Sequence, residues 1–174
     1  FPKSDVKILY NWTNFKELKR RSKISKKYKH FIYAGNIGEA QDLLSCSKFI
    51  NSLINKGHKV DFYSSGSHLE ELQHKLGFNK NLRFIEPVPM EQLSSQMFEY
   101  DGGFVFLAEG LLLDNIPGKI LSYLENGLPV FGAVNTGNEM VKMLSEHSLG
   151  LVVDSRKHLE STDYYQNVIA LCDK

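Results

Sequence analysis

Short apolar runs alternate with longer segments of helical period along most of this chain. The apolar runs are cut off by Gly, Pro or Ser, which is typical of buried strands. The longer segments repeat apolar residues every three or four positions and end at glycines such as Gly57 and Gly77, which is typical of amphipathic helices. The expected strands are 31–34, 60–63, 82–85, 104–107, 130–131 and 151–153, and the expected helices are 39–56, 68–76, 90–98, 117–126, 138–147 and 164–171. This alternation predicts an α/β, Rossmann-like fold with a doubly wound parallel sheet, which binds ligands at the carboxyl ends of its strands.

The composition is that of a globular protein with a substantial core. Hydrophobic residues make up 42% of the 174 residues and charged residues 24%, which is too apolar for a disordered chain. No apolar run approaches the ~18 residues of a membrane-spanning helix, and the N-terminus lacks the layout of a signal peptide. The two cysteines, Cys46 and Cys172, are too few for a disulfide framework. We therefore expect a cytoplasmic protein, and because the chain begins with Phe1 we expect part of a longer one.

The net charge of +1 hides an uneven distribution. Residues 1–30 carry ten Lys and Arg against two acidic residues, a balance of +8, whereas the other 144 residues carry −7. This total gives no whole-chain attraction to nucleic acid. We divide the chain into a basic lead-in or interdomain segment, 1–29, and a Rossmann-like domain, 30–174. The basic segment is interpreted as a solvated linker, with contact to a membrane surface as the alternative.

The turn after the first core strand is a candidate anion site. Gly35, Asn36, Ile37 and Gly38 lead into the expected helix, so backbone N–H groups and the positive end of a helix dipole would face a ligand. The turn is neither the G-x-G-x-x-G of dinucleotide binders nor a lysine-containing phosphate loop, which argues against a nicotinamide enzyme. A tight strand-to-helix turn without a ligand is the alternative.

The segment 114–119 is a second candidate anion site. Pro117 is expected to be the first residue of a helix, which places Lys119 in its first turn. A lysine there opposes the helix dipole, and a bound phosphate would supply the missing negative charge. A solvated lysine on an exposed turn is the alternative.

Three blocks carry a resemblance to a known family. They are Gly-Asn-Ile-Gly-Glu-Ala-Gln at 35–41, Pro-Gly-Lys-x-x-x-Tyr-x-x-x-Gly-x-Pro-Val at 117–130 and Gly-Leu-Val-Val at 150–153. In this order they resemble the C-terminal, donor-binding domain of GT-B glycosyltransferases, above all family 4 and its bacterial surface-polysaccharide branch. The resemblance implies that this chain is one half of a GT-B architecture, that a missing N-terminal domain binds the acceptor, and that the chain alone is inactive.

The resemblance also implies a substrate and a set of binding residues. A hexosyl or N-acetylhexosaminyl group would pass from a nucleoside-diphosphate sugar, expected to be UDP-linked, to a polysaccharide or lipid-linked acceptor at the inner face of a membrane. The reaction would retain configuration and need no metal or other cofactor. The donor diphosphate and sugar would contact Gly35, Asn36, Ile37, Gly38, Gln41, Asp114, Asn115, Gly118 and Lys119. The nucleoside would contact Ser64, Gly66, Pro87, Val88 and Ser122.

Departures from the family pattern keep a second interpretation open. Many members carry Arg and Lys where this chain has Asn36 and Gln41, and their paired glutamates fall on Asp114 and Ser122. A serine cannot supply a carboxylate. The alternative is therefore a degenerate, non-catalytic module of the same fold that binds nucleotide or docks a partner. An epimerase of this fold would need more carboxylates and histidines, and no catalytic residue or metal ligand is assigned.

Overall fold

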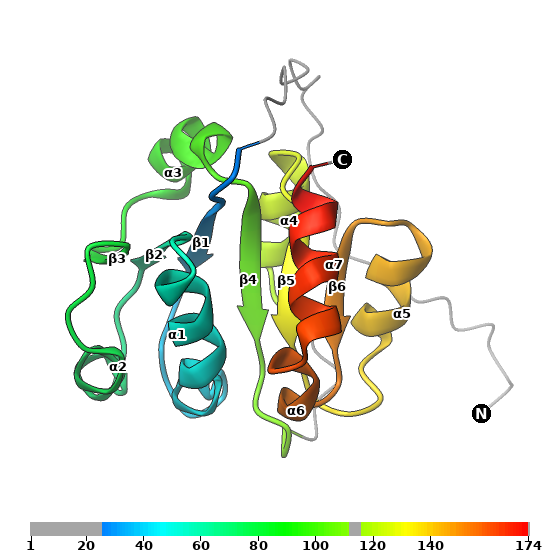
Figure 1. The fold of residues 1–174 in the computed structure, drawn as a ribbon, viewed down its shortest axis with the longest axis horizontal. Helices are drawn as coiled ribbons and strands as arrows, with labels where there is room; N and C mark the ends of the chain where they lie inside the picture. Colours follow the sequence, from blue (N-terminus) through cyan, green and yellow to red (C-terminus); the bar gives the residue numbers. More distant parts are fainter. Residues whose placement is uncertain (1–25, 112–115, 174) are drawn as a thin grey trace, which may run out of the picture.

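The computed structural model describes residues 26–111 and 116–173 of the chain. Within them, six parallel strands form one sheet in the order β3-β2-β1-β4-β5-β6 (Figure 1). The strands are β1 (His30–Ala34), β2 (Lys59–Tyr63), β3 (Leu82–Ile85), β4 (Gly102–Phe106), β5 (Val130–Ala133) and β6 (Gly150–Val153). The strand order reverses between β1 and β4, so the predicted doubly wound, Rossmann-like fold is confirmed. Most of the basic segment, residues 1–25, lies outside the described residues.

Helices follow almost every strand. They are η1 (Leu43–Cys46), α1 (Ser47–Asn55), α2 (Leu69–Leu76), α3 (Met90–Gln96), η2 (Met97–Glu99), α4 (Lys119–Glu125), α5 (Glu139–Glu146), α6 (Arg156–Leu159) and α7 (Thr162–Cys172). The sequence explains several of their ends. Gly57 follows α1 with a φ of 93°, a conformation that favours glycine, and the Ser161 side chain accepts a hydrogen bond from the Tyr164 N–H at the start of α7.

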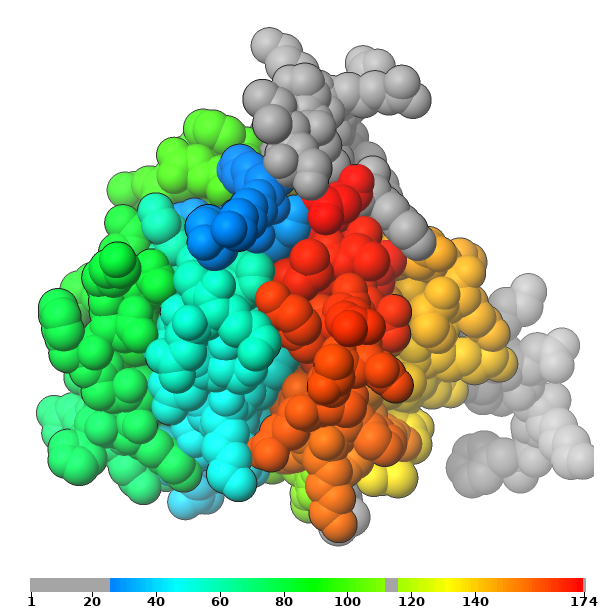
Figure 2. All heavy atoms as spheres, in the orientation of Figure 1, coloured from blue at the N-terminus to red at the C-terminus, as the bar shows by residue number. Residues whose placement is uncertain are grey.

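Two hydrophobic cores cover the two faces of the sheet because side chains alternate along each strand. On β1, Phe31 and Tyr33 point to one face and Ile32 to the other. The first core packs against α1, α2 and α7, with Phe49, Ile50, Leu72, Tyr164 and Val168. The second packs against α3, α4 and α5, with Leu93, Ile120, Tyr123, Met140 and Leu144. In Figure 1, α1 and α7 lie in front of the sheet and α4 behind it, and Figure 2 shows α1 in cyan beside α7 in red.

The pairing along β1 is uneven. β1 pairs with β2 over five positions, from His30↔Lys59 to Ala34↔Tyr63. On its other side it pairs with β4 at two positions, Phe31↔Gly102 and Ile32↔Gly103. The two halves of the sheet therefore meet along a short ladder.

In the described part of the chain, no helix is both long and apolar enough to cross a membrane.

Candidate functional site

The loops after β1 and β2 lie side by side at the carboxyl edge of the sheet. The Gly35 N–H donates a hydrogen bond to the Tyr63 carbonyl (3.0 Å), and the Ile37 N–H donates to the Ser65 carbonyl (2.8 Å). The His68 N–H returns a hydrogen bond to the Ile37 carbonyl (3.0 Å). These bonds bring the turn at 35–38, named the first glycine turn below, into contact with the loop at 64–68. The first was predicted to contact the diphosphate and the second the nucleoside.

A groove of about 230 Å³ opens beside these two loops. It is lined by Ala34, Gly35, Asn36, Tyr63, Ser65, Pro87, Val88, Met90 and Leu93. Four of these residues were predicted from the sequence: Gly35, Asn36, Pro87 and Val88. The wall formed by residues 87–93 is largely apolar, whereas the opposite wall offers backbone and amide groups. Such a groove suits one flat, partly polar ring of a ligand.

The first glycine turn differs from the prediction, because no helix begins at Glu39. Residues 35–42 form a loop, and α1 begins only at Ser47, after η1. The Gly38 carbonyl accepts hydrogen bonds from the N–H groups of Gln41 and Asp42 (both 3.1 Å). Asp42 then adopts a left-handed conformation (φ 44°, ψ 50°), which interrupts helical geometry. The expected helix N-terminus beside Gly38 is therefore absent, and an anion there would meet loop amides.

Tyr123 fixes α4 at the end of β1. Its side chain is fully buried, and its hydroxyl accepts a hydrogen bond from the Ala34 N–H (2.8 Å). Lys119 lies one helical turn before Tyr123, so both side chains project from the same face of α4. The helix begins at Lys119 with Gly118 before it, rather than at Pro117 as predicted.

The side chain of Lys119 reaches across the carboxyl end of β1. Its Nζ lies 3.9 Å from the centre of the Tyr33 ring, a cation–π contact. A Cβ built on Gly35 would lie 2.9 Å from this Nζ, and the Gly35 φ of 137° also disfavours a side chain. Lys119 and the turn at 35–38, each a candidate anion site in the sequence, therefore lie side by side.

The Lys119 ammonium lacks an anionic partner among the described residues. The ion pairs of residues 26–111 and 116–173 join other side chains. Burial lowers the pKa of Lys119 to about 7, because the charged form loses hydration that no carboxylate among the described residues replaces. A bound phosphate would restore the charge and raise this pKa. The arrangement therefore suits an anionic ligand placed over Gly35.

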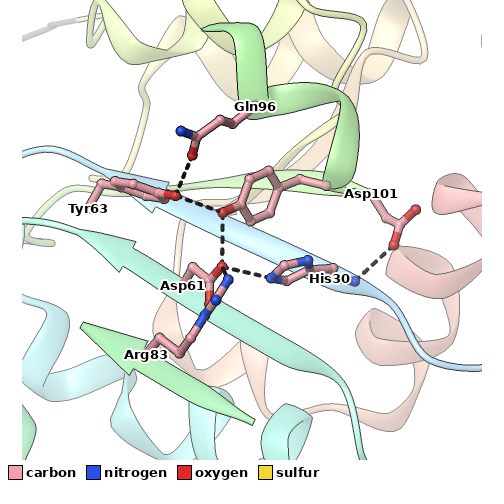
Figure 3. A network of polar contacts seen from close by, with 7 residues as sticks. His30, Asp61, Tyr63, Arg83, Gln96 and Asp101 are labelled. Atoms are coloured by element: carbon pink, nitrogen blue, oxygen red, sulfur yellow. Dashed lines mark hydrogen bonds and ion pairs between the residues drawn. The ribbon is translucent and has the colours of Figure 1, made fainter. Parts of the chain in front are cut away.

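A buried polar network supports the groove wall from behind (Figure 3). Tyr63 lines the groove, and its hydroxyl donates a hydrogen bond to Gln96 Oε1 on α3 (2.8 Å). The Tyr100 hydroxyl lies 3.3 Å from that of Tyr63 and donates to Asp61 Oδ2 (2.9 Å). These contacts fix the Tyr63 ring and hold α3 against the sheet.

Asp61 is the centre of this network. Its carboxylate is 1% exposed and accepts hydrogen bonds from Arg83 Nε (2.8 Å), from His30 Nε2 (2.8 Å) and from Tyr100. Burial alone would raise its pKa, but the hydrogen bonds from Arg83, His30 and Tyr100 outweigh burial and hold the pKa well below its usual value. This network was not predicted from the sequence, although an aspartate inside the apolar run 60–63 is a sign of it.

Three other predicted residues, Ser64, Gly66 and Ser122, do not line the groove. Ser64 is buried, and its Oγ has no hydrogen-bond partner within the described residues. Gly66 packs on Ile37, since a Cβ at Gly66 would lie 2.3 Å from the Ile37 carbonyl oxygen. The Ser122 carbonyl accepts a hydrogen bond from Asn126 within α4. The binding roles of these residues stay predictions, and Asp114 and Asn115 lie outside the described residues.

The amide side chains of the first turn pair with each other. Asn36 Nδ2 donates a hydrogen bond to Gln41 Oε1 (3.2 Å) at an exposed position. These are the two positions where the resembling family often carries cations. Around this turn and elsewhere in residues 26–111 and 116–173, no three His, Cys, Asp or Glu side chains gather as metal ligands would.

Comparisons with known proteins bear on the fold. No protein-family model and no curated protein matches the sequence. The chain is similar to the structure of TarM from S. aureus in complex with fondaparinux, α-GlcNAc-glycerol and UDP (TM-score 0.63, 10% identity, 97% of this chain and 34% of that chain). It is also similar to WaaG, a glycosyltransferase involved in lipopolysaccharide biosynthesis (TM-score 0.57, 14% identity, 86% and 43%). A third similar structure is the pneumococcal O-GlcNAc transferase GtfA in complex with UDP and GlcNAc (TM-score 0.53, 17% identity, 85% and 29%).

These likenesses establish a glycosyltransferase-like fold of the GT-B type for this chain. The chain spans about a third of the length of the TarM chain.

Proposed function

We propose that this chain is the C-terminal, donor-binding half of a GT-B glycosyltransferase of the family 4 type. It holds a nucleoside-diphosphate sugar, UDP-linked, at the carboxyl edge of the sheet, and a separate N-terminal domain holds a polysaccharide or lipid-linked acceptor. The observation that carries the proposal is the half-buried Lys119 ammonium beside Gly35, which has no carboxylate partner among the described residues. TarM and GtfA, which share the fold, have been solved with UDP.

The described residues suggest how the donor is oriented. The base occupies the groove between Tyr63 and the wall at Pro87 and Val88, and the diphosphate lies over Gly35 against Lys119. As the glycosidic bond breaks, negative charge develops on the leaving diphosphate, and the Lys119 ammonium and nearby amides stabilise that charge. This chemistry needs no metal or cofactor. We propose transfer of a hexosyl or N-acetylhexosaminyl group with retained configuration, in the cytoplasm or peripherally at the inner face of the membrane.

Titration with UDP, GDP and UDP-sugars tests the proposal. We expect saturable binding of UDP, monitored by amide chemical shifts or by the melting temperature. Lys119→Ala should weaken UDP binding by about 2 kcal/mol, because a hydrogen bond from a charged group is lost. Lys142→Ala is the matched control: it removes an exposed lysine on α5, which pairs with the exposed Glu146 at 3.7 Å. Equal binding by both variants would refute the role of Lys119.

A degenerate binding or docking module is the second candidate. The observation that favours it is the Asn36–Gln41 pair, which puts two neutral amides where cations would strengthen phosphate binding. The same titration separates the two candidates. Absence of any response to millimolar nucleotide would favour docking, whereas saturable UDP binding favours the donor-binding half.

A further inference from the structure

Arg156 links the segment after β1 to the segment after β4. It is the first residue of α6, and its side chain is 11% exposed. The guanidinium Nη2 donates a hydrogen bond to the carbonyl of Leu107, the residue after β4. Nε donates to Ser45 Oγ (2.9 Å) and lies 3.7 Å from Asp42 Oδ2. One side chain thus contacts both the segment after β1 and the segment after β4.

Backbone contacts join the same two segments. The Ala108 N–H donates a hydrogen bond to the Ala40 carbonyl (2.9 Å), which connects the loop after β4 directly to the first glycine turn. The backbone N–H of Arg156 donates to Glu109 Oε1 (2.8 Å). Arg156 therefore holds the loop after β4 at Leu107 and at Glu109, on both sides of the Ala108–Ala40 bond.

One part of the guanidinium is not paired. Nη1 of Arg156 is buried and has no hydrogen-bond partner among the described residues. A buried, charged donor without a partner costs free energy, and most buried polar groups are satisfied. The planar guanidinium therefore contacts Leu107, Ser45 and Asp42 through Nη2 and Nε, and this orientation leaves the N–H groups of Nη1 unpaired within the described residues.

We propose that Arg156 is a positioning residue for the donor diphosphate. It locks the loop after β4 to the first glycine turn, so that Gly35 and its neighbours keep a fixed geometry before a ligand arrives. This inference rests on the proposed function. It predicts that Arg156 affects the phosphate part of the donor rather than the nucleoside part, because its contacts are to residues 42–45 and 107–109 and not to the groove wall at 87–93.

The test compares uridine and UDP binding in the full 174-residue chain and in three variants. Arg156→Met removes the fork, Arg156→Lys keeps the charge but not the paired geometry, and Lys157→Met changes the exposed neighbour on α6. For Arg156→Met we expect the preference for UDP over uridine to fall roughly tenfold, since preorganisation is lost, with the uridine Kd unchanged. Arg156→Lys should recover part of the preference, and Lys157→Met should resemble the wild type.

Amide hydrogen exchange tests the role of Arg156 without any ligand. Hydrogen exchange of the Ala108 amide should accelerate in Arg156→Met, whereas amides within β1 and β4 should exchange as in Lys157→Met. Equal losses of uridine and UDP affinity, or an unchanged preference, would show a merely structural role and overturn the proposal. Failure of the wild type to bind UDP would reject the proposed function instead. In that case a selective acceleration at Ala108 would still support the lock, and its absence would overturn it.

Discussion

The ammonium group of Lys119 is partly dehydrated in the free chain, and an anionic ligand would offset the free-energy cost of this dehydration. The ammonium contacts the Tyr33 ring and lies beside Gly35, but burial has removed its hydration and no carboxylate of residues 26–111 or 116–173 pairs with it. The sequence predicted this residue because a lysine at the start of a helix opposes the helix dipole. It could not predict the contact with Tyr33, which depends on how α4 packs over β1.

The lowered pKa of Lys119 predicts a pH-dependent donor affinity. In the free chain the amine loses its proton near pH 7, and only the charged form attracts phosphate. The Kd of a UDP-sugar should therefore increase on the order of tenfold between about pH 6.5 and about pH 8.5, because the bound state takes up a proton. A UDP-sugar is the appropriate probe, since its diester phosphates do not titrate in this range.

Isothermal titration at several pH values would measure this effect. Lys119→Ala should bind weakly with a nearly flat profile, and Lys142→Ala should keep the wild-type profile. A flat profile in the wild type would contradict the assignment of the titrating group.

At the scale of elements, the pattern of apolar and turn residues predicted the bounds of the strands more accurately than the starts of the helices. All six strands lie within two residues of their predicted bounds, because each is an apolar run ended by a turn residue. The helix predicted over 39–56 is present as α1, but its predicted start at Glu39 was wrong. Glu39, Ala40 and Gln41 favour a helix locally, whereas hydrogen bonds to the loop after β2 hold this turn open. The short helix α6 was not predicted.

The same limit explains which site residues the sequence missed. Tyr63 was predicted to be a core residue only, and it is both buried and part of the groove wall. Asp61 and Arg156 act through partners that are distant in sequence: Arg83 and Tyr100 for Asp61, and Leu107 for Arg156. The period and spacing of apolar residues describe one helix or strand at a time. Side-chain hydrogen bonds between elements that are distant in sequence therefore cannot be predicted from them.

The network around Asp61 makes a prediction about β2 and its neighbours. Asp61→Asn should lower the free energy of unfolding by about 3 kcal/mol at pH 7, because the amide places N–H groups opposite the donors of Arg83, His30 and Tyr100. Urea denaturation measures this loss. Glu146→Gln, which neutralises an exposed pair with Lys142, should cost less than about 0.5 kcal/mol.

The pH dependence of this difference follows from the sign of the Asp61 shift. Its folded-state pKa lies below the unfolded value of about 3.9, so the stabilisation is present above that pH and is lost as the pH falls further. The difference between wild type and Asp61→Asn should therefore shrink below about pH 4. A difference that stays constant down to pH 3 would contradict the network as described.

At the scale of the whole molecule, one sheet is shared by two cores. Phe31 and Tyr33 belong to the first core and Ile32 to the second, although all three are neighbours on β1. Damage to either core therefore weakens the sheet on which the other core packs. This arrangement predicts a single cooperative unfolding transition rather than two.

Truncation of one fully buried residue in each core tests this coupling. Ile50→Ala on α1 and Leu144→Ala on α5 should each cost about 2–5 kcal/mol, since each leaves a cavity. Urea transitions followed by far-UV circular dichroism and by tyrosine fluorescence should coincide in both variants. Separate transitions in either variant would show that the two faces unfold independently.

The short ladder between β1 and β4 lies close to the candidate site, so a bound ligand could affect how firmly the two halves of the sheet are held together. Within the described residues, β1 and β4 pair in register only at Phe31↔Gly102 and Ile32↔Gly103, and this ladder joins the two halves of the sheet. Gly35 follows β1, in the first half of the sheet, and Lys119 begins α4, which follows β4 in the second half. A ligand that contacts both residues would therefore link the two halves. Binding would then stiffen the contact between β1 and β4 as well as the loops that the ligand touches.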